Sequence, residues 1–177
     1  MIKKIALMLS IAILLPIGAM AQNLKLGHIN SQEIIVLMPE IEGMEKQLKE
    51  AGDQWEKELL KMREEYFAKI KEFQDTQATL SESIKKARQA ELADMEQRIS
   101  TLNQTAQQDL AKKQQDLAAP ILEKVRKAIS EVASENGYTY IFDIAAQSII
   151  YTSPSSNDIT VLVKKKLNLK DKPATAK

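Results

Sequence analysis

The run from residue 53 to residue 136 constrains the fold of this chain more than any other feature of the sequence. It contains no glycine and a single proline, Pro120. Glu, Lys, Gln, Ala and Leu dominate it, and these residues lose little conformational freedom on entering a helix. Between residues 74 and 83 the large apolar residues disappear, except Leu80, and Thr and Ser take their place. The run therefore predicts two long helices in an antiparallel hairpin, with its tip near residues 76–83.

A single apolar stripe follows each predicted helix, because apolar residues recur mostly at the three- and four-residue steps of one helical face. The first stripe comprises Ile41, Met44, Leu48, Ala51, Trp55, Leu59, Met62, Tyr66, Ile70 and Phe73. The second comprises Ile84, Leu92, Met95, Ile99, Leu102, Ala106, Leu110 and Leu117. Stripes this thin predict a coiled-coil-like arm over residues 44–119, roughly 50 Å long at 1.5 Å per residue, instead of a globular core.

The apolar pattern thickens after Pro120, which we expect to kink or restart the second helix. Ile121, Val125, Ile129 and Val132 follow it at close helical spacing. This segment therefore predicts a helix that is buried in a small body formed by residues 22–43 and 120–169.

The rest of the body reads as short elements. Residues 24–29 predict a strand, and Asn30 with Glu33 predicts the capped start of a short helix that ends at Pro39. Residues 138–144 and 148–152 predict two strands joined as a hairpin. Ser155 with Asp158 has the spacing of a second capping box before a last helix. The fold class is therefore α+β and mostly helical, with a small β-containing body and a long antiparallel helical hairpin.

A body of about 80 residues buries little apolar surface, and a strand hairpin has open edges. Both features predict a homo-oligomer that is joined through the body. The residues expected to build this oligomerisation body are Leu24, Leu26, Ile29, Tyr140, Phe142, Ile144, Ile149, Ile150 and Tyr151.

Residues 1–21 have the composition of a cleaved signal peptide. A basic start is followed by an apolar core over residues 5–15 and by Ala19-Met20-Ala21, an A-x-A cleavage site. The alternative is a single membrane anchor, but the apolar run is short for a span and Pro16 and Gly18 interrupt it. We expect a soluble protein outside the cytoplasm that begins near Gln22.

Composition and charge exclude several classes of protein. The chain has no cysteine, so it forms no disulfide. Loss of residues 1–21 removes two of the 25 basic side chains and none of the 24 acidic ones, which leaves 23 against 24 and a net charge of −1. A near-neutral chain without basic-aromatic clusters predicts no nucleic-acid binding. Lysines crowd the C-terminus, where we predict a solvated helix face and a disordered tail over residues 170–177; weak contact with anionic lipid is the alternative. These lysines are Lys164, Lys165, Lys166, Lys170, Lys172 and Lys177.

We find no pattern of an enzyme in the sequence. His28 is the only histidine, and no G-x-x-x-x-G-K-[ST] loop is present. The acidic residues alternate with lysine at the spacing of solvated helical ion pairs. The sequence therefore predicts no catalytic site, no metal site and no cofactor, and a function without ATP.

Large, adaptable apolar side chains on the arm predict a binding surface. The candidate client-binding residues are Trp55, Met62, Tyr66, Phe67, Phe73 and Met95. The alternative is that most of them hold the two helices together, since they lie on the stripes. Phe67 lies off the stripe, so it is the one expected to face outward.

The order of these segments resembles the Skp (OmpH-like) family of periplasmic chaperones. The resemblance rests on the signal peptide, the first strand, the long hairpin, and the C-terminal motifs Tyr140-Ile141-Phe142-Asp143, Ile150-Tyr151 and Asp158-Ile159-Thr160. It implies a trimer whose β-rich body carries three helical arms around a cavity. It also implies a holdase that keeps unfolded outer-membrane β-barrel proteins from aggregating in the periplasm.

One departure from that family concerns charge. Familiar members are basic, whereas the mature chain is not, so we expect a mainly apolar grip on clients. A structural coiled-coil spacer or adaptor of the cell envelope is the alternative function.

Overall fold

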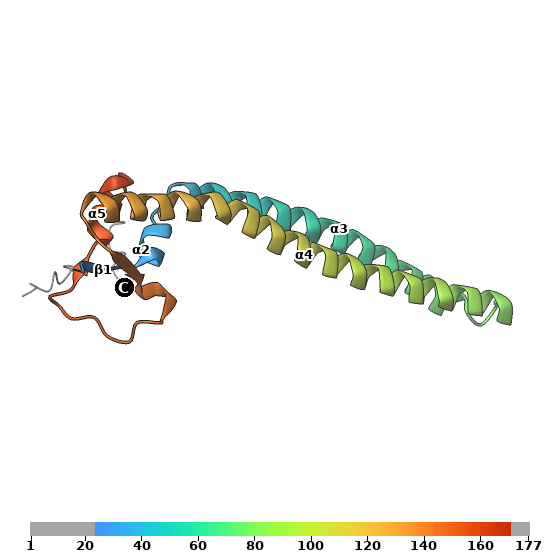
Figure 1. The fold of residues 1–177 in the computed structure, drawn as a ribbon. Helices are drawn as coiled ribbons and strands as arrows, with labels where there is room; N and C mark the ends of the chain where they lie inside the picture. Colours follow the sequence, from blue (N-terminus) through green and yellow to red (C-terminus); the bar gives the residue numbers. More distant parts are fainter. Residues whose placement is uncertain (1–23, 171–177) are drawn as a thin grey trace, which may run out of the picture.

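The computed structural model of the protein describes residues 24–170, so the predicted signal peptide and residues 171–177 lie outside the described part. A long helical hairpin projects from a small body (Figure 1). In chain order the elements are β1 (Leu26–Ile29), α2 (Ser31–Ile35), α3 (Glu40–Thr76), α4 (Glu82–Glu135), β2 (Tyr140–Asp143), the 3-10 turn η1 (Ile144–Ala146), β3 (Asn157–Asp158) and α5 (Thr160–Lys166). This architecture confirms the mostly helical α+β prediction.

The described strands form one small sheet in the order β2-β1-β3, and β1 pairs parallel with both neighbours. Leu26 lies opposite Tyr140, and His28 lies between Phe142 and Asp158. Gly27 occupies the crowded centre of the sheet. A Cβ atom there would lie 2.9 Å from side-chain atoms of both Ile141 and Tyr138, so the close packing requires glycine.

The predicted strand hairpin of residues 138–144 and 148–152 is wrong. Of residues 138–152, only residues 140–143 form a strand. The 3-10 turn η1 follows, and Gln147 then takes a left-handed conformation with φ of 54°. The chain therefore turns away, and residues 148–152 have no strand partner within residues 24–170. The third strand is β3, which can join β1 in parallel because the connection from β2 is long.

The body core collects residues from every helix of the body. Its fully buried members include Ile34 on α2 and Val163 on α5, which belong to the same cluster as Val125 on α4. The complete buried cluster is Ile29, Ile34, Met38, Ile121, Val125, Ala128, Val132, Ile159 and Val163. The expected dense packing after Pro120 is therefore confirmed.

Polar contacts tie β1 and α2 to the C-terminal segments of the body. The backbone N–H of Ser31 donates to Asp143 Oδ1 at 3.2 Å, and its hydroxyl donates to Asp143 Oδ2 at 2.5 Å. The N–H of Asn30 donates to Thr160 Oγ1 at 3.2 Å. Residues more than 100 positions apart in sequence thus hold one another in the body.

Helix starts in the body follow local capping chemistry, with one correction, and α2 ends at Ile35, four residues before the predicted end at Pro39. The Asn30 side chain accepts from the N–H of Glu33 as predicted, and α3 begins directly after Pro39. The predicted cap at Ser155 is wrong, because α5 begins only at Thr160. The Asp158 carboxylate accepts from the N–H of Thr160 at 2.8 Å, two residues on instead of three.

The hairpin consists of α3, with 37 residues, and the outer part of α4, with 54 residues in all. The two helices lie side by side along the arm (Figure 1). Residues 77–81 connect them, and the Ser81 hydroxyl caps α4 by accepting from the N–H of Ile84 at 3.5 Å. The predicted tip is confirmed. The helix continues through Pro120 without a restart, because Ile121 and Val125 anchor it in the body core.

Candidate binding surface

The seam between α3 and α4 contains five of the six predicted client-binding residues. Met95 is buried, with 3% of its surface exposed. The other four are half-buried on the α3 stripe: Trp55, Met62, Tyr66 and Phe73. These side chains pack the hairpin, as the alternative interpretation proposed. Their contact with another molecule stays a prediction.

Trp55 also makes a polar contact across the seam. Its indole Nε1–H donates to the Asp109 carboxylate at 3.1 Å. Its ring lies between two open grooves, one on each side of the hairpin. Leu60, Arg63 and Gln107 help to line one, and Gln54, Lys57 and Lys113 help to line the other. The indole is therefore held in place by α4 but stays accessible from both sides.

Phe67 points away from the seam, with 64% of its surface exposed. Its ring lies 5.8 Å from that of Tyr66, tilted by 50°. Leu60 is a second exposed apolar residue of α3, with 54% of its surface exposed, and it was not among the predicted binding residues. The two positions are seven residues apart, so they share a helical face two turns apart. The sequence contains a signal for this outward face: Leu60 lies off the stripe and seven residues before Phe67.

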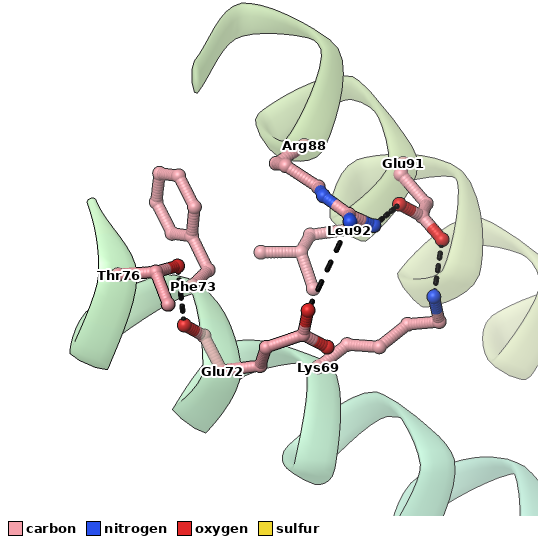
Figure 2. Close-up of a pocket in the computed structure, with 7 residues that line it drawn as sticks. All are labelled: Lys69, Glu72, Phe73, Thr76, Arg88, Glu91 and Leu92. Atoms are coloured by element: carbon pink, nitrogen blue, oxygen red, sulfur yellow. Dashed lines mark hydrogen bonds and ion pairs between the residues drawn. The ribbon is translucent and has the colours of Figure 1, made fainter. Parts of the chain in front are cut away.

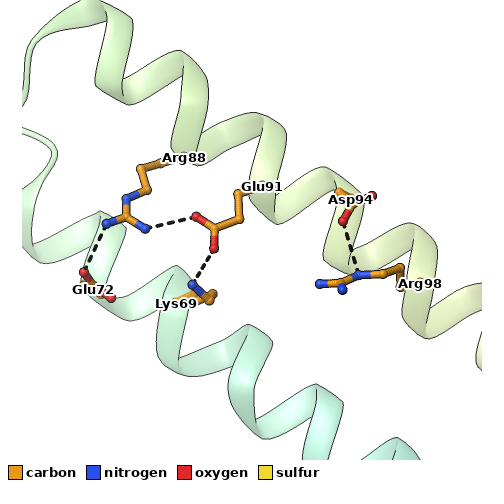
Figure 3. A network of polar contacts seen from close by, with 6 residues as sticks. All are labelled: Lys69, Glu72, Arg88, Glu91, Asp94 and Arg98. Atoms are coloured by element: carbon orange, nitrogen blue, oxygen red, sulfur yellow. Dashed lines mark hydrogen bonds and ion pairs between the residues drawn. The ribbon is translucent and has the colours of Figure 1, made fainter.

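Four charged side chains cross the seam near the tip (Figure 3). Lys69 donates to Glu91, and Arg88 Nη1 lies 3.0 Å from the other oxygen of Glu91. Arg88 Nη2 also lies 3.8 Å from Glu72 Oε1 on α3. The hydrogen bonds from Lys69 and Arg88 lower the pKa of Glu91. This network joins the outer turns of α3 and α4.

The same four residues line a small pocket with an apolar pair at the end of the seam, Phe73 on α3 and Leu92 on α4. The Phe73 ring lies on the side of Thr76, away from the contacts of Glu91 with Lys69 and Arg88 (Figure 2). Phe73 and Leu92 are both half-buried at this end of the seam.

The body exposes a second apolar surface. Tyr140 and Phe142 lie on one face of β2 with ring centroids 6.5 Å apart, and both are exposed. Ile150 is fully exposed and Tyr151 is 77% exposed, on the segment that lacks a strand partner within residues 24–170. Of the other predicted oligomerisation residues, Leu24 and Leu26 are exposed, Ile144 and Ile149 are half-buried, and Ile29 is buried in the chain's own core. Leu26 lies opposite Tyr140 in the sheet, so the exposed side chains of Leu26, Tyr140 and Phe142 belong to neighbouring strands at one edge of the sheet.

Two of the four C-terminal lysines that the structure describes, Lys164 and Lys166, pair with acidic residues of the body. Lys164 contacts Glu33, and Lys166 Nζ lies 2.6 Å from Glu135 and 3.2 Å from Glu131. The hydrogen bonds from Lys166 to these two carboxylates raise its pKa. These contacts agree with a solvated helix face and leave less free charge for anionic lipid.

Within residues 24–170 no group of three or more His, Cys, Asp or Glu side chains is placed to hold a metal ion. His28 lies in β1 with its Nε2 3.9 Å from Asp158 Oδ2. The helices of the same residues also include none that is both long and apolar enough to cross a bilayer.

Comparison with known proteins gives one consistent result. Residues 25–167 match the family described as "Outer membrane protein (OmpH-like)". The chaperone protein Skp of Yersinia enterocolitica is 28% identical over 158 residues, which cover 89% of this chain and 94% of that protein. The chaperone protein Skp of Photorhabdus laumondii subsp. laumondii is 26% identical over 154 residues, or 87% of this chain and 92% of that protein.

A solved OmpH-like structure from Caulobacter crescentus has the same fold. It superposes with a TM-score of 0.65 at 16% identity, over 81% of this chain and 83% of that one. A match over 81% of this chain must include parts of both the body and the arm. The architecture described above is therefore that of the OmpH-like structure.

Proposed function

This chain belongs to the OmpH-like family, and from that premise we propose that it is an ATP-independent holdase chaperone. Its clients are unfolded outer-membrane β-barrel proteins, which it holds between helical arms in the periplasm. Relatives named chaperone protein Skp, aligned over most of their length, support this assignment and a non-enzymatic function.

The observation that carries the proposal is the outward face of α3. Phe67 and Leu60 are more than half exposed on an arm whose own packing does not use them. An unfolded β-barrel strand exposes alternating apolar residues and aggregates readily. A holdase that binds this state lowers its free concentration by mass action, through many weak contacts instead of one deep pocket. Half-buried Trp55 adds contact area where the grooves beside the seam are open, and Met62, Tyr66 and Phe73 stay further candidates on the same stripe.

The chain acts as a homo-oligomer, and the family resemblance favours a trimer. Exposed Tyr140, Phe142, Ile150 and Tyr151 supply an apolar surface that a second copy would cover. Several arms on one body raise the effective concentration of weak client sites. Body residues 22–43 and 120–169 thus assemble the protein, and arm residues 44–119 bind.

Export completes the proposal. Cleavage after Ala21 releases a soluble periplasmic protein. Mass spectrometry of the purified protein should find a chain that begins at Gln22; an intact Met1 would contradict cleavage.

The direct test is light scattering of a urea-unfolded β-barrel protein on dilution into buffer. We expect scattering to fall to a low plateau as the mature protein is added, in both low and moderate salt, because the contacts are mainly apolar. An envelope spacer or adaptor would leave the scattering unchanged, and that result would overturn the chaperone proposal.

A further inference from the structure

The two grooves beside Trp55 differ in chemistry. The one on the side of Gln107, which we call the apolar groove, has six apolar lining residues: Gly52, Trp55, Leu59, Leu60, Ala106 and Leu110. The other has only Ala51 beside the same indole, and Gln54 and four charged side chains complete it. The apolar groove is open to solvent and has a volume of about 370 Å³, so a large side chain of another molecule can enter it.

Gly52 keeps the apolar groove open. A Cβ atom at Gly52 would meet no other atom within 4 Å, apart from the helix's own neighbouring backbone, so packing inside the hairpin does not require glycine there. Gly27 is the opposite case, because the sheet leaves no room for its Cβ. Glycine is the weakest helix former after proline, so Gly52 lowers the stability of a 37-residue helix. Its other effect is the space that it leaves beside Trp55.

The floor of the apolar groove is already ordered. The indole Nε1–H of Trp55 donates to the Asp109 carboxylate at 3.1 Å, which fixes the ring relative to α4. Leu59 and Ala106 are buried in the seam, with 9% and 3% of their surfaces exposed. A side chain that enters the groove therefore meets a surface that needs little further ordering, which favours binding.

Two groups at the apolar groove favour an aromatic ring over an aliphatic side chain. An aromatic ring packs on an indole with an attraction beyond that of the buried area alone. Arg63 lines the same groove, and no ion pair within residues 24–170 involves its guanidinium. A cation with no carboxylate partner can lie over the face of a bound ring, and an aliphatic side chain offers it no such contact.

The apolar groove is continuous with the outward face of α3. Leu60 belongs to both, and residues at helical steps of four, four, three and four lead from the groove to Phe67: Gly52, Glu56, Leu60, Arg63 and Phe67. The helix rises about 22 Å from the first to the last of them, at 1.5 Å per residue. A transmembrane β-strand of about 9–11 residues is roughly 30–36 Å long when extended, so one client strand can reach both places.

We propose that the apolar groove is a subsite for an aromatic side chain of the client, and that Gly52 sets this preference by keeping the groove open. Trp55 and Arg63 contact the bound ring. The proposal rests on the holdase function proposed above and adds which client side chains the arm prefers. Outer-membrane β-barrels carry a girdle of aromatic residues at each membrane interface, so an unfolded strand supplies such side chains near its ends.

Trp55 is the only tryptophan of the chain, so its fluorescence reports directly on the apolar groove. The probes are two peptides of about ten residues, the length of one barrel strand. Both alternate serine with valine and lack tryptophan, and they differ only at one central apolar position, which is phenylalanine in one and leucine in the other. Titrated into full-length mature protein, the phenylalanine peptide should shift the Trp55 emission to shorter wavelength. It should also bind about two- to tenfold more tightly than the leucine peptide.

Gly52→Leu fills the apolar groove with a good helix former, so the arm stays folded and its surface stays apolar. We expect the two peptides to bind this variant equally. Gly43→Leu is the matched control, since it makes the same substitution in the same helix, also with free space around the Cβ atom, but away from both grooves beside Trp55. It should keep the preference for phenylalanine. Circular dichroism checks the helix content of each variant.

Arg63→Gln tests the subsite without changing its shape. Arg63 is exposed, so its replacement should leave the fold intact and reduce the preference for phenylalanine. Equal affinities of the two peptides for the unchanged protein would overturn the subsite, and so would a preference that persists undiminished in both Gly52→Leu and Arg63→Gln.

The porin light-scattering assay separates this proposal from the holdase function. Suppression of aggregation by a protein that binds both peptides equally would remove the aromatic subsite alone. A phenylalanine preference without any suppression would remove the holdase function and leave the preference of the groove in place.

Discussion

The body half and the arm half of α4 pack in different ways. Between Ile121 and Val132, four side chains are almost completely buried against α2, α5 and β1. Between Ile84 and Leu117 the same helix buries only Met95 and Ala106 to that degree. One continuous helix therefore belongs to a globular core at one end and to a thin seam at the other. Dense packing makes a body that assembles, whereas thin packing leaves side chains and grooves that another chain can contact.

The largest expected effect comes from the exposed apolar surface of the body. Phe142→Asp with Ile150→Asp should dissociate the oligomer and unfold the body, because charges cannot be buried at the interface and a small body has little stability of its own. Native mass spectrometry at micromolar concentration measures the assembly. A folded monomer would show that the body needs no partner. An unchanged oligomer would place the interface elsewhere.

Matched isoleucine substitutions compare the two regions directly. Ile159→Ala removes a fully buried side chain from the body core and should cost about 2–5 kcal/mol of unfolding free energy. Ile99→Ala removes a half-buried side chain from the arm seam and should cost about 1 kcal/mol. Urea unfolding at one fixed protein concentration gives both values. Equal costs would mean that the arm is as tightly packed as the body.

Within the arm, neighbouring residues separate packing from binding. Leu59→Ser removes a buried seam side chain and should destabilise the arm by about 2 kcal/mol. Phe67→Ser and Leu60→Ser alter exposed side chains and should change stability by less than about 0.5 kcal/mol while weakening client binding. Thermal melting by circular dichroism, run beside a porin aggregation assay, checks both effects. If Phe67→Ser melts at a lower temperature and still binds clients normally, Phe67 packs the arm and does not bind clients.

The fold could be predicted where its cause is local. Helical periodicity placed the seam residues from Ile41 to Phe73 correctly, since side-chain direction along a helix depends only on spacing. Ile149-Ile150-Tyr151 has strand propensity and still forms no strand in the structure of one chain, because a strand also needs a partner. Asn157 and Asp158 have no such propensity, and they join the sheet through β1, about 130 residues away.

The candidate binding surface could be predicted only in part, because the accessibility of a side chain on α3 also depends on the helix that packs against it. Apolar residues of the arm could be recognised from the sequence, and so could the outward direction of Phe67. Which of the others stay accessible depends on how α4 covers them. The contact of Trp55 with Asp109 and the charged residues around Phe73 arise from helix register, which no single segment of sequence contains.

The smallest expected effect concerns the charge network near the tip. Glu91 has a lowered pKa in the folded arm because Lys69 and Arg88 donate to its carboxylate. Its contribution to stability is therefore present above the ordinary glutamate pKa and is lost as the pH falls through the lowered folded value. The outer arm should melt slightly earlier in acid, and Glu91→Gln should remove this difference between neutral and acid pH. Hydrogen exchange of residues 69–76 and 88–92 measures the stability of the outer arm at each pH. If this stability depends on pH in Glu91→Gln as it does in the unchanged protein, the charge network is not the cause of the pH dependence.

The central claim is that the arm binds and the body assembles, and one deletion tests it. Removing residues 56–110 and closing the gap with a short glycine-containing turn takes away most of the thin seam together with the outward face, and leaves the body core whole. Aggregation of a urea-unfolded porin is then followed by light scattering with the full-length protein and with this armless variant at equal oligomer concentration. We predict that the variant keeps its oligomeric state and loses all suppression of aggregation. An armless oligomer that still holds the client as well as the full-length protein would contradict the account.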